Sequence, residues 1–221
     1  MANDLQLILF DLDGTLVDTA PDLGGTVNRM RRTRGLPELP IEHYRPAVSL
    51  GAVGLLASGL ALTPEHPEYA PAVEEFLGLY EAHICEHSTL FPGIPELLEW
   101  IESKGKQWGV VTNKRRRFTQ PLMQALNLTL RASTIVCADT TAAPKPSPLP
   151  MLHALREAGC RAEQTIYIGD DERDVVAGKA AGMRTAAITY GYHSPSSHPS
   201  SWGADELFDC PDSITRFLQT H

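Results

Sequence analysis

Cysteine is scarce in this chain of 221 residues. Its four cysteines lie far apart in the sequence, and none belongs to a Cys-x-x-Cys pair that would indicate a zinc site. Three of them have apolar neighbours, so we expect small core residues rather than metal ligands. The four are Cys85, Cys137, Cys160 and Cys210.

The sequence also lacks long apolar runs and an excess of basic charge. No apolar stretch reaches the roughly 20 residues of a membrane-spanning helix, and the N-terminus has no signal-peptide pattern. We therefore expect a cytoplasmic protein without a membrane partner. Lys and Arg number 19 against 27 Asp and Glu, a net charge of −8. This balance disfavours a general nucleic-acid binder, but a local cationic site for a small anion stays possible.

Short apolar segments alternate with helical patterns over most of the chain. Six segments are candidate parallel strands, at 5–10, 108–112, 133–138, 165–169, 185–189 and 206–210. Five helical patterns follow them, at 95–103, 117–126, 148–158, 172–181 and 212–219. This alternation predicts an α/β fold with a Rossmann-like, doubly wound parallel sheet. Ligands of such sheets bind at the carboxyl ends of the strands.

Residues 18–90 break the alternation. They contain no convincing strand but several amphipathic stretches, such as 21–34 and 71–87. We expect an inserted all-helical cap domain over 18–90. The Rossmann-like core would then consist of residues 1–17 and 91–221.

Two carboxylates stand two positions apart where the first strand is expected to end, in Asp11-Leu12-Asp13-Gly14-Thr15. Like charges so close repel, and partly buried carboxylates need a cation or hydrogen-bond donors around them. A divalent metal is the simplest compensation, and the glycine opens the loop toward a phosphate. Three more polar elements follow near expected strand ends. They are Thr112-Asn113, Lys145-Pro146-Ser147-Pro148 and Gly169-Asp170-Asp171-Glu172-Arg173-Asp174.

Each element alone has an ordinary structural explanation, such as a helix cap or a turn. In this order, however, the four resemble the motifs of the haloacid dehalogenase superfamily, most of whose members are phosphatases. The resemblance covers nearly the whole chain, and the helical insertion resembles the C1 cap of the phosphoglycolate phosphatase-like branch. It implies that Asp11 is the nucleophile, forming an aspartyl-phosphate. Asp13 would protonate the leaving oxygen and then deprotonate the attacking water.

The resemblance also implies a Mg²⁺ cofactor and a phosphate clamp. The metal ligands would be the carboxylates of Asp11 and Asp170 and the backbone carbonyl of Asp13. The phosphate clamp would consist of Thr112, Asn113 and Lys145.

Two further acids follow in the last motif. The resemblance implies that Asp174 orients Lys145 or a metal-bound water rather than binding the metal. Asp171 departs from the pattern, since related phosphatases often have serine at this place.

The expected cap has no lysine but five arginines, at 29, 31, 32, 34 and 45. We expect Arg45 to reach the closed site and pair with a substrate carboxylate in bidentate fashion. It precedes Ser49-Leu50-Gly51, which resembles the specificity loop of C1 caps.

The substrate class is expected to be a small phosphorylated metabolite that carries a carboxylate. Phosphoglycolate phosphatases come first, on the resemblance of Phe10 to Pro21 and of Thr189-Tyr190-Gly191-Tyr192. The alternative is the bacterial N-acetylmuramate 6-phosphate phosphatases, on three other segments. These are Arg34 to Pro37, Trp108 to Lys114 and Ser201 to Asp205.

Other activities on the same scaffold can be weighed. Dehalogenases generally lack the second aspartate, so Asp13 argues against carbon–halogen cleavage. Phosphonate hydrolysis needs a cap lysine, but the first lysine here is Lys104. A sugar-phosphate mutase stays open, because it shares both aspartates. A catalytically silent phosphate sensor is disfavoured by the intact motifs, and the sequence leaves monomer and homodimer open.

Overall fold

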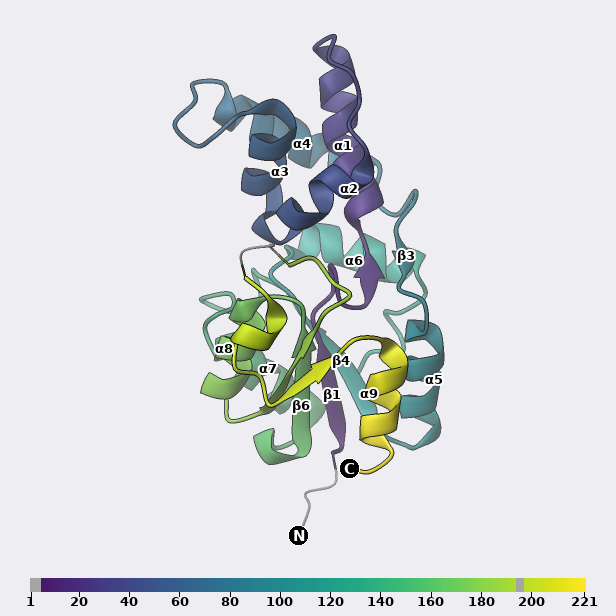
Figure 1. Ribbon diagram of the computed structural model, residues 1–221. Coiled ribbons are helices and arrows are strands. Elements are labelled where there is room, and N and C mark those ends of the chain that lie inside the picture. The colour runs from purple at the N-terminus through teal and green to yellow at the C-terminus, as the bar shows by residue number, and fades with distance from the viewer. Residues whose placement is uncertain (1–4, 194–196) are drawn as a thin grey trace.

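A six-stranded parallel sheet forms the lower part of the molecule in the computed structural model, which describes residues 5–193 and 197–221 (Figure 1). In spatial order its strands are β5 (Ile135–Val136), β4 (Gln107–Val111), β1 (Leu7–Phe10), β6 (Thr165–Gly169), β7 (Arg184–Ile188) and β8 (Glu206–Phe208). Each neighbouring pair is parallel. All six predicted strands are present, so the expected doubly wound sheet is confirmed.

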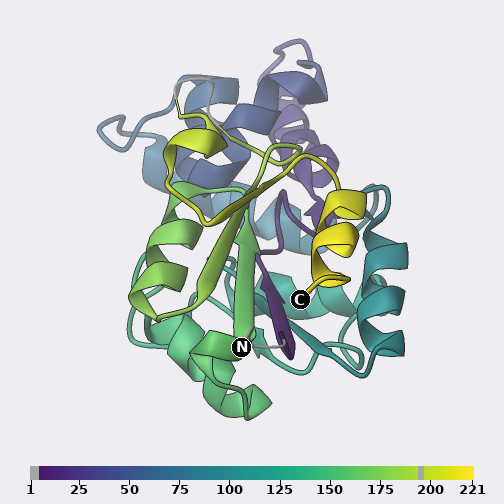
Figure 2. The same ribbon diagram turned by 60° about the horizontal axis from the view of Figure 1, so that its bottom comes forward.

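Helices cover both faces of the sheet. One face carries α5 (Ile94–Ser103), α6 (Arg116–Ala125) and α9 (Pro211–Leu218), and the other carries α7 (Leu149–Ala158) and α8 (Glu172–Ala180). Figures 1 and 2 show α5 and α9 on the opposite side of the sheet from α7 and α8. Ile8 and Phe10 of β1 pack into the first layer, while Leu7 and Leu9 pack into the second. This alternation explains why the strand is apolar at every position.

A second group of helices lies above the sheet (Figure 1). In the chain, it comes between β1 and α5. It consists of α1 (Ala20–Thr33), α2 (Ile41–Tyr44), the 3-10 helix η1 (Arg45–Leu50), α3 (Gly51–Leu60) and α4 (Tyr69–Ala82). Val27, Met30, Leu55 and Phe76 are buried within it, so the group has an apolar centre. The predicted helical cap is therefore present, although its division at residues 18 and 90 stays a prediction.

Two short strands connect the cap to the core, and the sequence did not predict them. β2 (Val17–Asp18) pairs antiparallel with β3 (Thr89–Leu90) where the chain enters and leaves the cap. Strands of two residues have no alternating pattern that could reveal them. Phe91 N donates to Leu16 O at 3.0 Å and extends the contact between the two connections.

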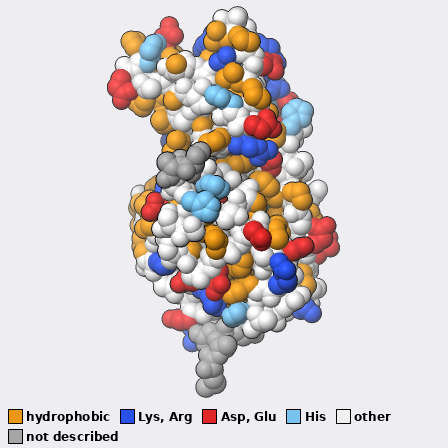
Figure 3. All heavy atoms as spheres, viewed as in Figure 1, with side chains coloured by type: hydrophobic (Ala, Val, Ile, Leu, Met, Phe, Trp, Pro, Cys, Tyr) orange, Lys and Arg blue, Asp and Glu red, His pale blue; other side chains and the backbone are white. Residues whose placement is uncertain are grey.

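Several smaller expectations can be compared with the structure. Cys137 is buried as expected, whereas the other three cysteines are partly exposed, and all four are free. No helix in the described ranges is long and apolar enough to cross a membrane; the cytoplasmic location stays a prediction. On the face in Figure 3, acidic and basic side chains are interspersed, and the surface is indented between cap and core. Part of the loop expected at 192–203, namely 194–196, lies outside the described residues.

Candidate active site

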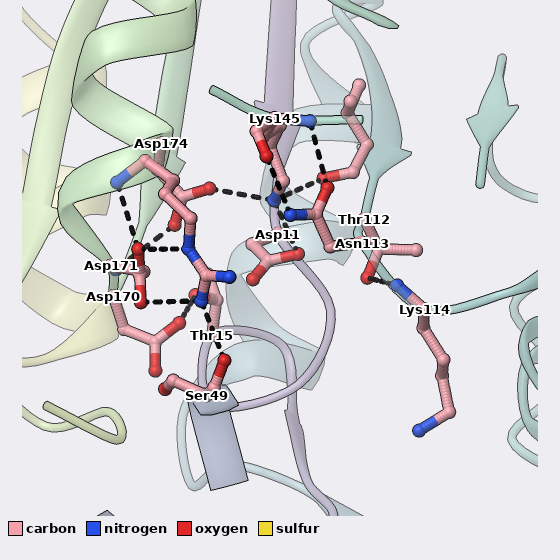
Figure 4. A network of polar contacts seen from close by, with 12 residues as sticks. Asp11, Thr15, Ser49, Thr112, Asn113, Lys114, Lys145, Asp170, Asp171 and Asp174 are labelled. Atoms are coloured by element: carbon pink, nitrogen blue, oxygen red, sulfur yellow. Dashed lines mark hydrogen bonds and ion pairs between the residues drawn. The ribbon is translucent and has the colours of Figure 1, made fainter. Parts of the chain in front are cut away.

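Three adjacent strands, β4, β1 and β6, end at the same edge of the sheet. The last residue of β1 pairs in register with Val110 of β4 and Ile168 of β6. The residues that follow these strands, Asp11, Thr112 and Asp170, are therefore brought to one place. Figure 4 shows Asp11 in the middle, with Thr112 on one side and Asp170 on the other.

Three carboxylates gather at this edge. One oxygen each of Asp11, Asp170 and Asp174 lies within 4.8 Å of the other two. Burial raises the pKa of Asp11 to about 6, with Lys145 acting in the opposite direction. Burial, Asp11 and Asp174 together raise the pKa of Asp170 well above its ordinary value. The cluster therefore carries an unfavourable electrostatic energy that a cation would relieve.

The donor atoms of this cluster suit a hard divalent cation. All are carboxylate oxygens, which Mg²⁺ and Ca²⁺ prefer. Asp11 Oδ1 is buried and, in the described part of the chain, has no hydrogen-bond partner apart from its ion pair with Lys145. Asp170 is held in place, because Thr15 Oγ1 and Tyr192 N donate to its two oxygens at 2.9 and 2.7 Å. Gly14 (φ 88°) closes the loop, and a Cβ there would lie 2.0 Å from Asp170 Oδ2.

Lys145 is the buried cation that faces these acids. Its Nζ lies 2.9 Å from Asp11 Oδ1 and 2.7 Å from Asp174 Oδ1. It also donates to Val111 O at 2.9 Å and to Tyr167 Oη at 2.8 Å. Burial alone would lower the pKa of Lys145, but Asp11 and Asp174 raise it above its usual value. The ammonium group is therefore charged and fixed in direction at neutral pH.

The Lys145 loop is attached to the end of β4 through Asn113. The Asn113 side chain donates to Lys145 O at 2.9 Å and accepts from Lys145 N at 3.0 Å. Both polar atoms of the Asn113 side chain are therefore occupied by the backbone of Lys145. Thr112 is also held, since its Oγ1 accepts from Lys114 N at 3.2 Å. The predicted phosphate residues are therefore brought together, with Asn113 in a positioning contact.

Asp13 has two partners that the sequence did not single out as site residues. Thr19 Oγ1 donates to Asp13 Oδ1 at 2.7 Å, and Lys114 Nζ donates to the same oxygen at 2.9 Å. The Lys114 ammonium also lies 4.7 Å from the ring centre of Tyr80, on α4 of the cap. Burial would lower the pKa of Lys114, but Asp13 and Tyr80 raise it above its usual value.

Asp171 belongs to a different contact from the acidic cluster. Its Oδ1 accepts from Arg173 N at 2.9 Å and from Arg173 Nε at 2.7 Å, so it caps α8. Arg173 Nη2 also donates to Ser49 O of the cap at 2.6 Å. Burial would raise the pKa of Asp171, but its hydrogen bonds with Arg173 hold it below the usual value. The pair therefore connects the core to the cap.

Arg45 is not brought to the other predicted residues. Its guanidinium forms a two-pronged ion pair with Asp18, with distances of 3.0 and 2.7 Å. The same group lies 5.7 Å from the ring centre of Tyr192, whose hydroxyl also donates to Asp18. Arg45 was expected to contact a substrate carboxylate, but its guanidinium is already paired with Asp18 at the base of the cap.

A cavity of about 280 Å³ lies between the cap and the strand ends. Asp11, Asp13, Thr112, Asn113 and Lys114 line its polar side. The apolar side includes Leu23, Val48, Phe76, Leu77, Tyr80 and Phe118. A ligand with a charged end and a partly apolar body would match the polar and apolar sides of this cavity.

Comparison with known proteins gives this site a context. The chain is 44% identical over 214 residues to the N-acetylmuramic acid 6-phosphate phosphatase of Pseudomonas aeruginosa, covering 97% of this chain and 95% of that protein. It is 42% identical over 209 residues to the phosphoglycolate phosphatase of Xanthomonas campestris pv. campestris, covering 95% and 94%. A crystal structure of a predicted phosphoglycolate phosphatase from Haemophilus somnus matches with a TM-score of 0.83 at 27% identity, covering 98% and 99%.

An α/β sheet whose strand ends gather carboxylates and a buried lysine defines an enzyme that acts on a small charged ligand. The sequence profile of the haloacid dehalogenase-like hydrolases matches residues 8–188. The chain belongs to this family, and with relatives named as phosphatases over nearly its whole length it is a phosphatase. Members of this family generally use a metal ion, and the acidic cluster gives this chain a place for one.

Proposed function

We propose that this enzyme is a Mg²⁺-dependent phosphomonoesterase that acts through Asp11 on a small phosphate ester bearing a carboxylate. One observation carries the proposal. Asp11 belongs to an all-oxygen acidic cluster, forms an ion pair with Lys145 and lies next to Thr112 at the polar end of the cavity between cap and core. Phosphoryl transfer needs this combination, because its catalysis consists mostly of positioning and charge stabilisation.

In the first step, Asp11 attacks phosphorus and the ester oxygen leaves, giving an aspartyl-phosphate on Asp11. Lys145 and the Thr112 hydroxyl hold the phosphoryl oxygens, where the transition state concentrates negative charge. Bound at Asp11 and Asp170, Mg²⁺ would offset the repulsion between the carboxylates and the phosphoryl group. Asp174 pairs with Lys145 and keeps its ammonium directed at Asp11. Asp174 itself does not bind the phosphate.

Asp13 handles the protons in both steps. It gives a proton to the leaving oxygen, and it later takes one from the water that attacks the aspartyl-phosphate. Its place in the loop beside Asp11 puts it on the cavity side of the site, where both the leaving group and the water would be. The cap would limit access of bulk water while the phosphoryl group is transferred.

The cavity favours the larger of the two candidate substrates. About 280 Å³ is close to the lower limit of roughly 300 Å³ for pockets that enclose drug-sized ligands. The two-carbon body of 2-phosphoglycolate would leave most of this space and its apolar wall without a contact. N-acetylmuramate 6-phosphate would fill more of it, with its acetyl and lactyl groups against the apolar side. The sequence put 2-phosphoglycolate first, and relatives of both names match the chain; we rank N-acetylmuramate 6-phosphate first on the size of the cavity.

Steady-state kinetics on a substrate panel test this proposal. With Mg²⁺ present, kcat/KM is expected to be at least about tenfold higher for N-acetylmuramate 6-phosphate than for 2-phosphoglycolate. Glucose 6-phosphate, a sugar phosphate without a carboxylate, should rank below both. A preference for 2-phosphoglycolate would reassign the substrate and keep the phosphatase, whereas release from none of the three would reject the proposed function.

Metal binding is expected to stabilise the fold measurably. At a hundredfold excess over its dissociation constant, Mg²⁺ should raise Tm by about 5–10 °C, because it binds the folded state alone and offsets repulsion in the cluster. Differential scanning fluorimetry after chelation and Mg²⁺ addition measures the shift. Asp170→Asn should remove most of it, while Asp212→Asn, on the exposed start of α9, should keep it. An undiminished shift in Asp170→Asn would place the metal elsewhere.

A further inference from the structure

Lys114 is a buried cation that the proposed chemistry does not use. Its side chain is 8% exposed, yet it lines the cavity on the side of the cap. A buried ammonium is costly unless it has an anionic partner, and here that partner is Asp13. The ring of Tyr80 lies against it and fixes its position between core and cap.

The contact with Lys114 engages the carboxylate of Asp13. Asp13 Oδ1 accepts from both Lys114 Nζ and Thr19 Oγ1, so the Lys114 ammonium already pairs with a carboxylate among the residues that line the cavity. A carboxylate on a substrate in this cavity offers the Lys114 ammonium the same kind of partner as Asp13.

We propose that Lys114 recognises the carboxylate of the substrate, exchanging its ion pair with Asp13 for an ion pair with this carboxylate. This inference rests on the proposed phosphatase function and names the residue that recognises the carboxylate of the substrate. The exchange keeps Lys114 paired with one carboxylate throughout, so the buried charge is compensated before and after binding. A substrate without a carboxylate leaves Lys114 paired with Asp13 and lacks this contact, so its kcat/KM is lower.

Other cations near the cavity fit this role less well. Arg173 lines the cavity, but Asp171 and Ser49 O already take its guanidinium. Arg45 does not line the cavity and is paired with Asp18. Arg115 lines the cavity but is exposed, where water screens its charge. Lys114 alone among these four combines burial, access to the cavity and contact with a proposed catalytic aspartate.

Matched substrates separate this role from a structural one. N-acetylglucosamine 6-phosphate lacks the lactyl carboxylate of N-acetylmuramate 6-phosphate, and ethyl phosphate lacks the carboxylate of 2-phosphoglycolate. In Lys114→Met, the preference for the carboxylated member of each pair should fall about 10- to 100-fold, as expected for loss of one hydrogen bond to a charged group.

The outcomes are distinct. An equal fall on both members of a pair would overturn the proposal, because Lys114 would then only position Asp13 or support the fold. Lys114→Gln, which keeps a polar group for Asp13 without the charge, repeats the test if Lys114→Met does not fold. Lys104→Met, an equal change of charge on the exposed end of α5, should leave every rate unchanged. Absence of phosphate release by the wild type would instead reject the proposed function.

Arg45→Ala tests the earlier assignment in the same assay. Since Arg45 is paired with Asp18 and lies outside the cavity lining, its loss should lower both members of a pair together. A selective fall for the carboxylated member in Arg45→Ala, with none in Lys114→Met, would transfer the role to Arg45.

Discussion

Replacing Asp11 with Asn is expected to lower phosphate release by about 10⁴-fold or more. The amide keeps the shape of the side chain but is too weak a nucleophile to attack phosphorus. It also removes one charge from the cluster that would hold the metal. A continuous phosphate-release assay with Mg²⁺ and saturating substrate measures the effect, and scanning fluorimetry on the same sample checks the fold.

The control for this change is Asp212→Asn, which makes the same replacement of a carboxylate by an amide at an exposed aspartate at the start of α9. We expect its rate to equal that of the wild type. Folded Asp11→Asn protein is expected to be at least as stable as the wild type without metal, because a partly buried negative charge has been removed. Residual activity within tenfold of the wild type would contradict the assigned nucleophile.

Lys145→Met is expected to damage both stability and activity. Lys145 is 4% exposed and is paired with Asp11 and Asp174, so its removal leaves two carboxylates without their cation. Breaking a buried ion pair in this way costs about 3–5 kcal/mol of unfolding free energy. Urea titration without metal measures this loss. Activity should fall by at least about 10²-fold even where the variant is folded, because a charged phosphate clamp is missing.

Mg²⁺ makes this second prediction more specific. The loss of unfolding free energy should be smaller with saturating Mg²⁺ than without metal, since a bound cation takes over part of the compensation. Lys104→Met, with the same change on an exposed lysine, should change the unfolding free energy by less than about 0.5 kcal/mol. A Lys145 variant as stable as this control in the absence of metal would contradict the proposed electrostatics of the cluster.

The meeting of Asp11, Thr112 and Asp170 could be predicted because each follows an apolar strand. Parallel strands place such residues at one edge whatever the loops between them do. Lys145 has no such position, and its proposed role came from resemblance to a family motif. Its contact with Asp174 depends on the start of α8, which the sequence indicates as a helix but does not orient.

The contacts of the cap with the core could not be predicted. Lys114 opens the basic run Lys114-Arg115-Arg116-Arg117, which resembles a solvated helix start, and its burial depends on Tyr80 from another element. Arg45 carried the right charge for a carboxylate, but the carboxylate that it meets is Asp18, 27 positions earlier. The sequence shows that such residues are charged, but it does not show which residue each one pairs with. The ion-pair partner depends on how the helices pack.

Acid quench of Asp13→Asn during turnover of p-nitrophenyl phosphate tests the central claim, phosphoryl transfer to Asp11, most directly. p-Nitrophenolate leaves without a proton, so the first step should proceed, while loss of Asp13 slows the attack of water on the aspartyl-phosphate. Intact-mass and peptide analysis should then find one phosphoryl group per chain, on the peptide that contains Asp11, and none in the Asp11→Asn, Asp13→Asn double variant. Release of p-nitrophenol with no phosphoryl group on Asp11 would contradict the account.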